Sequence, residues 1–184
     1  IRQHMYGIEL ARYDTTVRAR TPGKTLTLGF IGGLTPHKGC HVLLKAFRQL
    51  GRSDVRLKVY GNPHQAPAYF ASLQELAAGR DAIEFCGTVP NTAIAGALAE
   101  MDAVVVPSVW LENAPLAIHS ALAARCPVVA SDFPGMSELI HDGENGLLFI
   151  PGNADSLAAA LRRLLDEQNL LRDLSTRCRP VKSI

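Results

Sequence analysis

The sequence predicts an α/β protein with a doubly wound, mostly parallel sheet of the Rossmann type. From residue 25 to residue 167, apolar segments of strand length alternate with segments whose apolar residues have helical spacing. A strand followed by a crossover helix is the repeating unit of a parallel sheet. Two of these crossings, at 29–44 and 107–123, would aim helix amino termini at the carboxyl edge of the sheet. Open α/β sheets bind their ligands at that edge.

The expected elements follow from local patterns of apolar residues. Strands are expected at 25–31, 55–61, 82–87, 102–108, 127–131 and 145–150. Helices are expected at 39–50, 67–78, 91–101, 115–125, 135–140 and 155–167. Asn91 is a residue type that caps helix amino termini, and Pro115 presets the backbone angle of a first helical turn.

Composition restricts the kind of protein. The chain has 184 residues, of which 47% are hydrophobic and 20% charged, as in one soluble globular domain. Its net charge of +2 gives no support for a nucleic-acid-binding surface. No apolar run approaches the roughly 20 residues that span a bilayer, so no transmembrane segment is expected. The cysteines and histidines lack the spacing of a metal site, and no metal is expected.

Residues 1–24 are polar and lack sustained periodicity, which indicates an inter-domain connection. The domain itself is therefore expected to span 25–184. The chain begins at Ile1 without an initiator methionine and ends in a polar run without a helix-capping signal. We expect a fragment of a longer chain that is inactive alone, because a crevice with one wall missing cannot enclose an acceptor or exclude water.

The first crossing carries a glycine pair and a lysine. Gly32 and Gly33 follow the strand at 25–31 and allow the backbone to approach a ligand closely. Lys38 is expected one turn into the next helix, where it can reach a phosphate bound at the helix amino terminus. The alternative is an ordinary glycine turn with a solvated lysine, because the string is neither a GxGxxG nor a Walker sequence.

The second crossing places a carboxylate at the mouth of the same crevice. Glu112 comes after the apolar strand 102–108 and just before the helix expected from Pro115. The N–H groups of Leu116 and Ala117 would be free for a ligand if no side chain caps them. The alternative is that Glu112 only caps the helix, because a carboxylate near a helix amino terminus is stabilising in itself.

Five separated motifs stand out along the chain, in the order GFIGGLTPHKG, YGN, FCGTV, DAVVVPSVWLENAPLAIHSALAARCPVVASDFPGMSELI and DGENGLLF. From about Met5 to its end, the chain resembles the carboxyl-terminal domains of family 4 retaining glycosyltransferases. That family has the GT-B fold, in which two Rossmann-like domains face each other and the second binds the nucleotide-sugar donor. The resemblance implies that this chain is one half of a GT-B architecture.

The resemblance also implies roles for individual residues. Lys38 and Glu112 would be the catalytic pair, with Lys38 on the donor diphosphate and Glu112 on hydroxyls of the transferred sugar. The backbone of Gly33 would assist Lys38, and Val89, which follows Gly87, would meet the nucleobase. Further donor contacts are implied at Gly32, Gly87, Asn113, Ala114, Pro115, Leu116, Ala117 and Ser120.

Two positions depart from the family pattern. Gly33 stands where the family usually has an arginine, so one phosphate-binding cation is absent. Ser120 stands where the family's E-x7-E motif, which begins at Glu112, ends in a ribose-binding glutamate. We expect Ser120 to face the crevice but to fall short of the ribose by two carbons. Ser120→Glu would then raise nucleotide affinity. The alternative is that Ser120 is a small residue packed at a helix crossing, where glutamate would destabilise the fold by burying an unpaired charge.

The expected function is donor binding in a retaining, metal-independent glycosyltransferase of the hexosyltransferase type, in polysaccharide biosynthesis. Its donor would be a UDP-sugar or GDP-sugar, and no separate cofactor is expected. A glycan or lipid-linked acceptor would bind through the missing amino-terminal domain. The expected location is the cytoplasm, either free or peripheral to the inner face of the membrane in the full-length protein.

Two other functions compete with this one. A degenerate, non-catalytic nucleotide-binding or assembly module is the main alternative, because Gly33 and Ser120 depart from the pattern. A dinucleotide-dependent oxidoreductase is disfavoured, since no GxGxxG follows the first strand and no acid ends the second strand.

Overall fold

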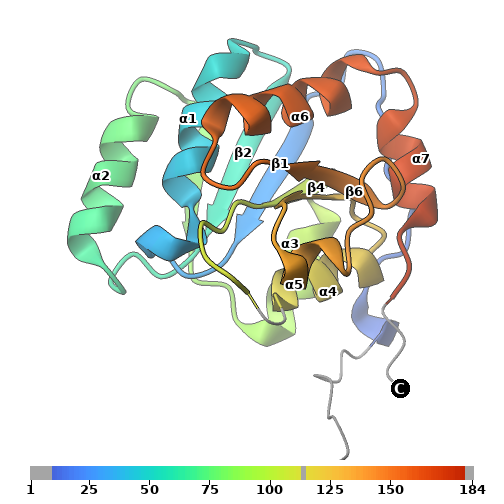
Figure 1. Cartoon of the computed structure of the whole chain (residues 1–184), viewed down its shortest axis with the longest axis horizontal. Coiled ribbons are helices and arrows are strands. Elements are labelled where there is room, and N and C mark those ends of the chain that lie inside the picture. The colour runs from blue at the N-terminus through green and yellow to red at the C-terminus, as the bar shows by residue number, and fades with distance from the viewer. Residues whose placement is uncertain (1–9, 113–114, 181–184) are drawn as a thin grey trace, which may run out of the picture.

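A computed structural model describes residues 10–112 and 115–180 of the chain. It contains one six-stranded parallel sheet with the strand order β3-β2-β1-β4-β5-β6 (Figure 1). The strands are β1 (Leu26–Ile31), β2 (Val55–Tyr60), β3 (Ile83–Gly87), β4 (Ala103–Val106), β5 (Val128–Ser131) and β6 (Gly146–Phe149). The order reverses between β1 and β4, as in a doubly wound sheet. The predicted fold class is confirmed.

Helices cover both faces of the sheet, which explains why the central strands are apolar throughout. One face carries α1 (Cys40–Leu50), α2 (Pro67–Ala77), α6 (Ala154–Asp166) and α7 (Leu170–Arg177). The other carries α3 (Ile94–Ala99), α4 (Leu116–Ala123) and α5 (Pro134–Ser137). Short 3-10 turns lie at Leu10–Arg12, Pro36–Lys38 and Asn91–Ala93.

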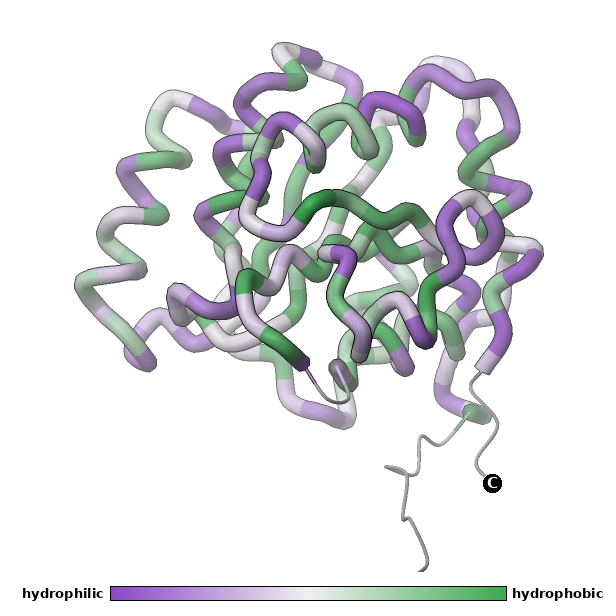
Figure 2. Tube along the Cα trace, viewed as in Figure 1, coloured by the Kyte–Doolittle hydropathy of each residue, from purple (hydrophilic) through white to green (hydrophobic). Residues whose placement is uncertain are grey.

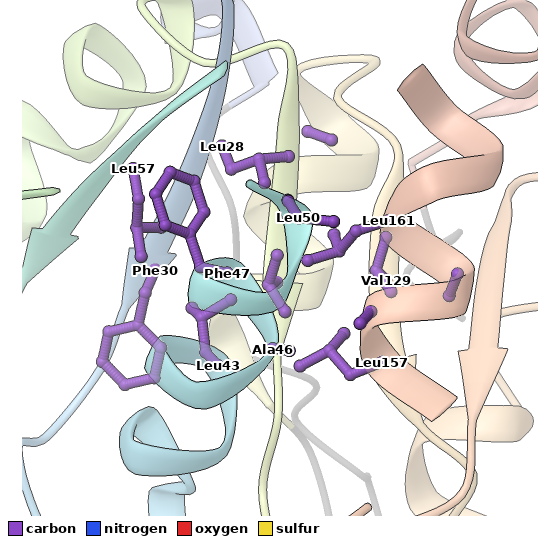
Figure 3. Close-up of a cluster of buried hydrophobic side chains, with 14 of the residues drawn as sticks. Leu28, Phe30, Leu43, Ala46, Phe47, Leu50, Leu57, Val129, Leu157 and Leu161 are labelled. Atoms are coloured by element: carbon purple, nitrogen blue, oxygen red, sulfur yellow. The ribbon is translucent and has the colours of Figure 1, made fainter. Parts of the chain in front are cut away.

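The larger core lies between the sheet, α1 and α6. Figure 3 shows Phe47 and Leu50 of α1 among side chains of the strands and of α6. Figure 2 shows that hydrophobic residues are concentrated in the strands and hydrophilic ones in the outer turns. Val105 of β4 joins this core, whereas Val104 and Val106 join the core on the opposite face. This alternation fixes which face of the sheet each residue of β4 meets.

Three local expectations differ from the structure. Asn91 does not cap a helix but begins a 3-10 turn that leads into α3. Lys38 lies in the 3-10 turn before α1, not inside the helix, because Gly39 adopts a left-handed conformation with φ of 71° between them. Helix α7 was not predicted at all, although it buries Leu171 and Leu174.

The described part of the amino-terminal segment packs onto the domain. Arg18 is 7% exposed, and its guanidinium donates to the carbonyl oxygens of Leu98 at 3.2 Å and Met101 at 3.4 Å, where α3 ends. Its backbone N–H donates to Oγ of Ser175 on α7 at 2.8 Å. A cation on the last carbonyls of a helix is favourable, so these contacts anchor the segment.

In the described part of the chain, no helix has the length and apolar character needed to cross a bilayer.

Candidate functional site

A cavity of about 260 Å³ lies where β1 and β4 end, at the point where the strand order reverses. It is lined by Phe30, Ile31, Gly32, Gly33, Lys38, Val105, Val106, Pro107, Ser108, Glu112, Pro115, Leu116 and Ala117. The crevice between diverging crossovers is the usual ligand site of such a sheet. The structure therefore brings most of the predicted donor-binding residues to one place.

The two segments that carry the charged residues are joined to each other. The N–H of Val109 donates to the carbonyl oxygen of His37 at 2.9 Å. A Cβ added to Gly39 would stand 1.8 Å from the carbonyl oxygen of Pro107, so only glycine allows this approach. Lys38 and Glu112, which flank these contacts in the chain, are consequently held close together in the cavity lining.

Lys38 and Glu112 form an ion pair with each other. The Lys38 Nζ donates to Oε1 of Glu112 at 2.6 Å and to Oε2 at 2.8 Å. Ser108 donates its hydroxyl to the same Oε1 at 2.7 Å. The side chain of Glu112 is 13% exposed and that of Lys38 is 32% exposed, so the lysine faces the solvent side of the pair. Lys38 is thus ion-paired rather than an isolated solvated lysine, and Glu112 makes no capping hydrogen bond to the described residues of α4.

Helix α4 points its amino terminus at the cavity. Pro115 immediately precedes the helix, and no described side chain caps it. Leu116 and Ala117 line the cavity in the first turn, where helix N–H groups have no partner within the helix. The predicted contacts at Asn113 and Ala114 lie outside the described residues.

Gly87 and Val89 do not line the cavity. Gly87 ends β3 with φ of 73°, and its carbonyl oxygen accepts from the N–H of Gly61 at 2.8 Å. Val89 packs against the core on the α4 face, as do the cavity residues Ile31 and Ala117. Their predicted contact with a nucleobase stays a prediction.

Ser120 does not have the predicted orientation. It is 5% exposed, does not line the cavity, and accepts a hydrogen bond from the Tyr13 hydroxyl at 3.1 Å. The amino-terminal segment meets α4 here, because Tyr13 packs against the same core as α4 and donates to the serine. The helical position of Ser120 could be anticipated from sequence, but its partner 107 residues away could not.

The position of the absent arginine is partly filled. A Cβ on Gly33 would stand 2.8 Å from Oε1 and 3.4 Å from Nε2 of Gln65. Gln65 lies in the exposed segment between β2 and α2. Its amide therefore lies over the glycine turn where the family usually places a cation.

A larger hollow of about 530 Å³ lies between α1 and α2, lined in part by His41, Lys45 and Tyr69. Two of its polar groups are partners of each other, since Nδ1 of His41 lies 2.8 Å from the Tyr69 hydroxyl. Burial lowers the pKa of His41 and raises the pKa of Tyr69 to about 12. We assign the functional site to the smaller cavity, because it combines a cation, an acid and a helix amino terminus.

The described residues contain no cluster of three His, Cys, Asp or Glu able to hold a metal.

Comparisons with known proteins agree with this assignment. Residues 25–167 match the family described as "Glycosyl transferases group 1". A Salmonella typhimurium glycosyltransferase named for colanic acid biosynthesis, WcaL, is 31% identical over 163 residues, which cover 84% of this chain and 39% of that protein. The phosphatidyl-myo-inositol mannosyltransferase of Mycobacterium leprae is 33% identical over 147 residues, covering 78% of this chain and 37% of that protein.

The fold is shared with solved structures. Anabaena Alr3699/HepE, crystallised with UDP and glucose, matches with a TM-score of 0.82 at 22% identity, over 94% of this chain and 49% of that one. The chain thus spans less than half the length of these proteins. Because the family match covers most of the chain, the protein belongs to the group 1 glycosyltransferases.

Proposed function

We propose that this chain is the donor-binding domain of a retaining glycosyltransferase that uses a nucleoside diphosphate sugar. The observation that carries the proposal is the cavity in which Lys38, Glu112 and the amino terminus of α4 meet. Its volume of about 260 Å³ and its two charged side chains suit a diphosphate and part of a sugar better than a whole dinucleotide. The structural neighbour HepE has been crystallised with UDP-glucose, which supports a donor of this class.

Each group has a distinct task in this proposal. Lys38 and the N–H groups at the start of α4 bind the diphosphate and stabilise the negative charge that grows on it as the sugar departs. Glu112 accepts hydrogen bonds from hydroxyls of the transferred sugar. The cleavage of the sugar–phosphate bond then requires positioning and charge stabilisation, and we expect no metal ion to take part.

The ion pair must open when the donor binds. Lys38 is held by both oxygens of Glu112, so a phosphate has to replace the carboxylate as its partner. The phosphate carries more charge than a carboxylate and is also attracted by α4, which favours the exchange. The released oxygen of Glu112 becomes available to the sugar.

The acceptor lies beyond this chain in our proposal. The matched proteins are more than twice as long as their matched parts, and a second GT-B domain would supply the opposite wall of the crevice. A glycan or lipid-linked acceptor would bind there. We place the whole protein in the cytoplasm, free or peripheral to the inner face of the membrane.

The proposal predicts that a nucleoside diphosphate binds more tightly than the corresponding monophosphate. Lys38→Ala should lower diphosphate affinity by about 1.5–3 kcal/mol, which is roughly tenfold or more, because a charge-assisted hydrogen bond is lost. Nucleoside affinity should change little. Isothermal titration calorimetry at modest salt, with the UDP and GDP series, measures both quantities.

Lys45→Ala is the matched control, since Lys45 lies on α1 outside the cavity and should leave every affinity unchanged. Equal affinities for diphosphate and monophosphate would contradict the phosphate site. Absence of any nucleotide binding would favour the degenerate assembly module. Gly33 and the buried Ser120 are the two departures from the family pattern on which that alternative rests. Binding of NAD instead would favour an oxidoreductase.

A further inference from the structure

Ser108 lines the cavity, although it was not among the predicted donor-binding residues. It is the second residue after β4 and is 1% exposed. Its hydroxyl donates to Oε1 of Glu112 at 2.7 Å. A buried hydroxyl with its hydrogen bond directed at a carboxylate restricts where that carboxylate can lie.

The hydrogen bonds to Glu112 are unequally distributed over its two oxygens. Oε1 accepts from both Ser108 and Lys38, whereas among the described residues Oε2 accepts from Lys38 alone. If a phosphate draws Lys38 away, Ser108 still holds Oε1. Oε2 is then the oxygen that is left free for a new donor.

The backbone around Ser108 is well fixed. The next residue, Val109, donates its N–H to His37 at 2.9 Å, and the preceding carbonyl of Pro107 lies against Gly39. Strand β4 itself is buried on both faces. Ser108 is therefore a rigid reference point, while Lys38 is the more exposed partner of Glu112.

We propose that Ser108 is a positioning residue, which holds the Glu112 carboxylate in place for the transferred sugar after Lys38 has exchanged to the donor phosphate. The inference rests on the proposed function, because it needs a nucleoside diphosphate sugar in this cavity. It assigns to Ser108 an effect on sugar recognition only. Binding of the nucleoside diphosphate does not require it.

The test compares a nucleotide sugar with its nucleoside diphosphate. The probes are UDP with UDP-glucose and GDP with GDP-mannose, and the pair that binds the unmodified chain more tightly is used. For Ser108→Ala we expect the ratio of nucleotide-sugar affinity to diphosphate affinity to fall by about three- to tenfold. The reason is that the Glu112 carboxylate is no longer held in place for the sugar hydroxyls. Diphosphate affinity should stay within about twofold of the unmodified chain. Ser108→Cys keeps a weak donor, should give an intermediate ratio, and serves in place of the alanine variant if that variant fails to fold.

Ser131→Ala is the matched control. Ser131 is likewise a buried serine at the end of the neighbouring strand β5, but it does not line the cavity and its hydroxyl has no partner among the described residues. This variant should change neither affinity. An unchanged ratio in Ser108→Ala, or an equal loss of both affinities with a lower Tm, would overturn the positioning role. If the Ser108 prediction fails but Lys38→Ala lowers diphosphate affinity in the same experiment, only the role of Ser108 is overturned. If no probe binds, the proposed function fails as well.

Discussion

Gly39→Ala is expected to destabilise the chain by about 2–4 kcal/mol. A non-glycine residue at φ of 71° costs about 1 kcal/mol, and the added Cβ would stand 1.8 Å from the Pro107 carbonyl oxygen. That contact involves backbone, so the segment after β4 has to shift, at a further cost of about 1–3 kcal/mol. Thermal unfolding should show a Tm lower by roughly 5–15 °C.

Gly51→Ala separates the two contributions to this effect. Gly51 ends α1 with φ of 61°, and a Cβ there would meet no atom within 4 Å. It should therefore cost only about 1 kcal/mol. If Gly39→Ala cost no more than Gly51→Ala, the close approach between the two segments would be absent. A shift of the segment should also weaken nucleotide-sugar binding relative to diphosphate binding, since Glu112, which binds the sugar in our proposal, moves with it.

Ser120→Glu is expected to lower the free energy of unfolding by about 2–4 kcal/mol without raising nucleotide affinity. The expectation from the sequence was tighter nucleotide binding, with this destabilisation as its alternative. Ser120 is 5% exposed beneath Tyr13, so a glutamate would bury a carboxylate with one hydroxyl as its partner. Equilibrium denaturation and calorimetry on the same sample measure both quantities.

Two further variants at this position separate size, charge and hydrogen bonding. Ser120→Gln adds the same bulk without the charge and should cost less than the glutamate. Ser120→Ala removes only the acceptor of the Tyr13 hydroxyl and should cost about 1 kcal/mol. Tighter nucleotide binding by Ser120→Glu with an unchanged Tm would show that this face of α4 does reach the ligand.

The elements that carry the site were predictable because their signals are local. Helix α1 buries seven residues at helical spacing, and β4 is a continuous apolar run. Helix α7 escaped prediction because it has only eight residues and buries just Leu171, Leu174 and Ser175, too short a pattern to establish a period. Asn169 before it is a residue type common at helix amino termini, but its φ is 70° and its side chain makes no capping hydrogen bond to α7.

Contacts between distant residues could not be predicted in the same way. The sequence placed Lys38 and Glu112 at one crevice, but it did not show that they would pair with each other across 74 residues. The orientation of Ser120 failed for a related reason, since Tyr13 belongs to a segment that was interpreted as a connection. Helix periodicity gives the face on which a side chain lies, whereas the packing of other segments decides what that face meets.

The Lys38–Glu112 pair also affects how a ligand arrives. Two opposite charges 2.6 Å apart form a dipole, and its field decays much faster with distance than that of a single lysine. An approaching diphosphate therefore feels little attraction from the pair beyond the Debye length of about 8 Å at physiological salt. The pair contributes little to electrostatic steering, so the association rate should depend only weakly on ionic strength. Discrimination among anions would then arise from the residence time of the bound anion, after Lys38 has exchanged from Glu112 to that anion.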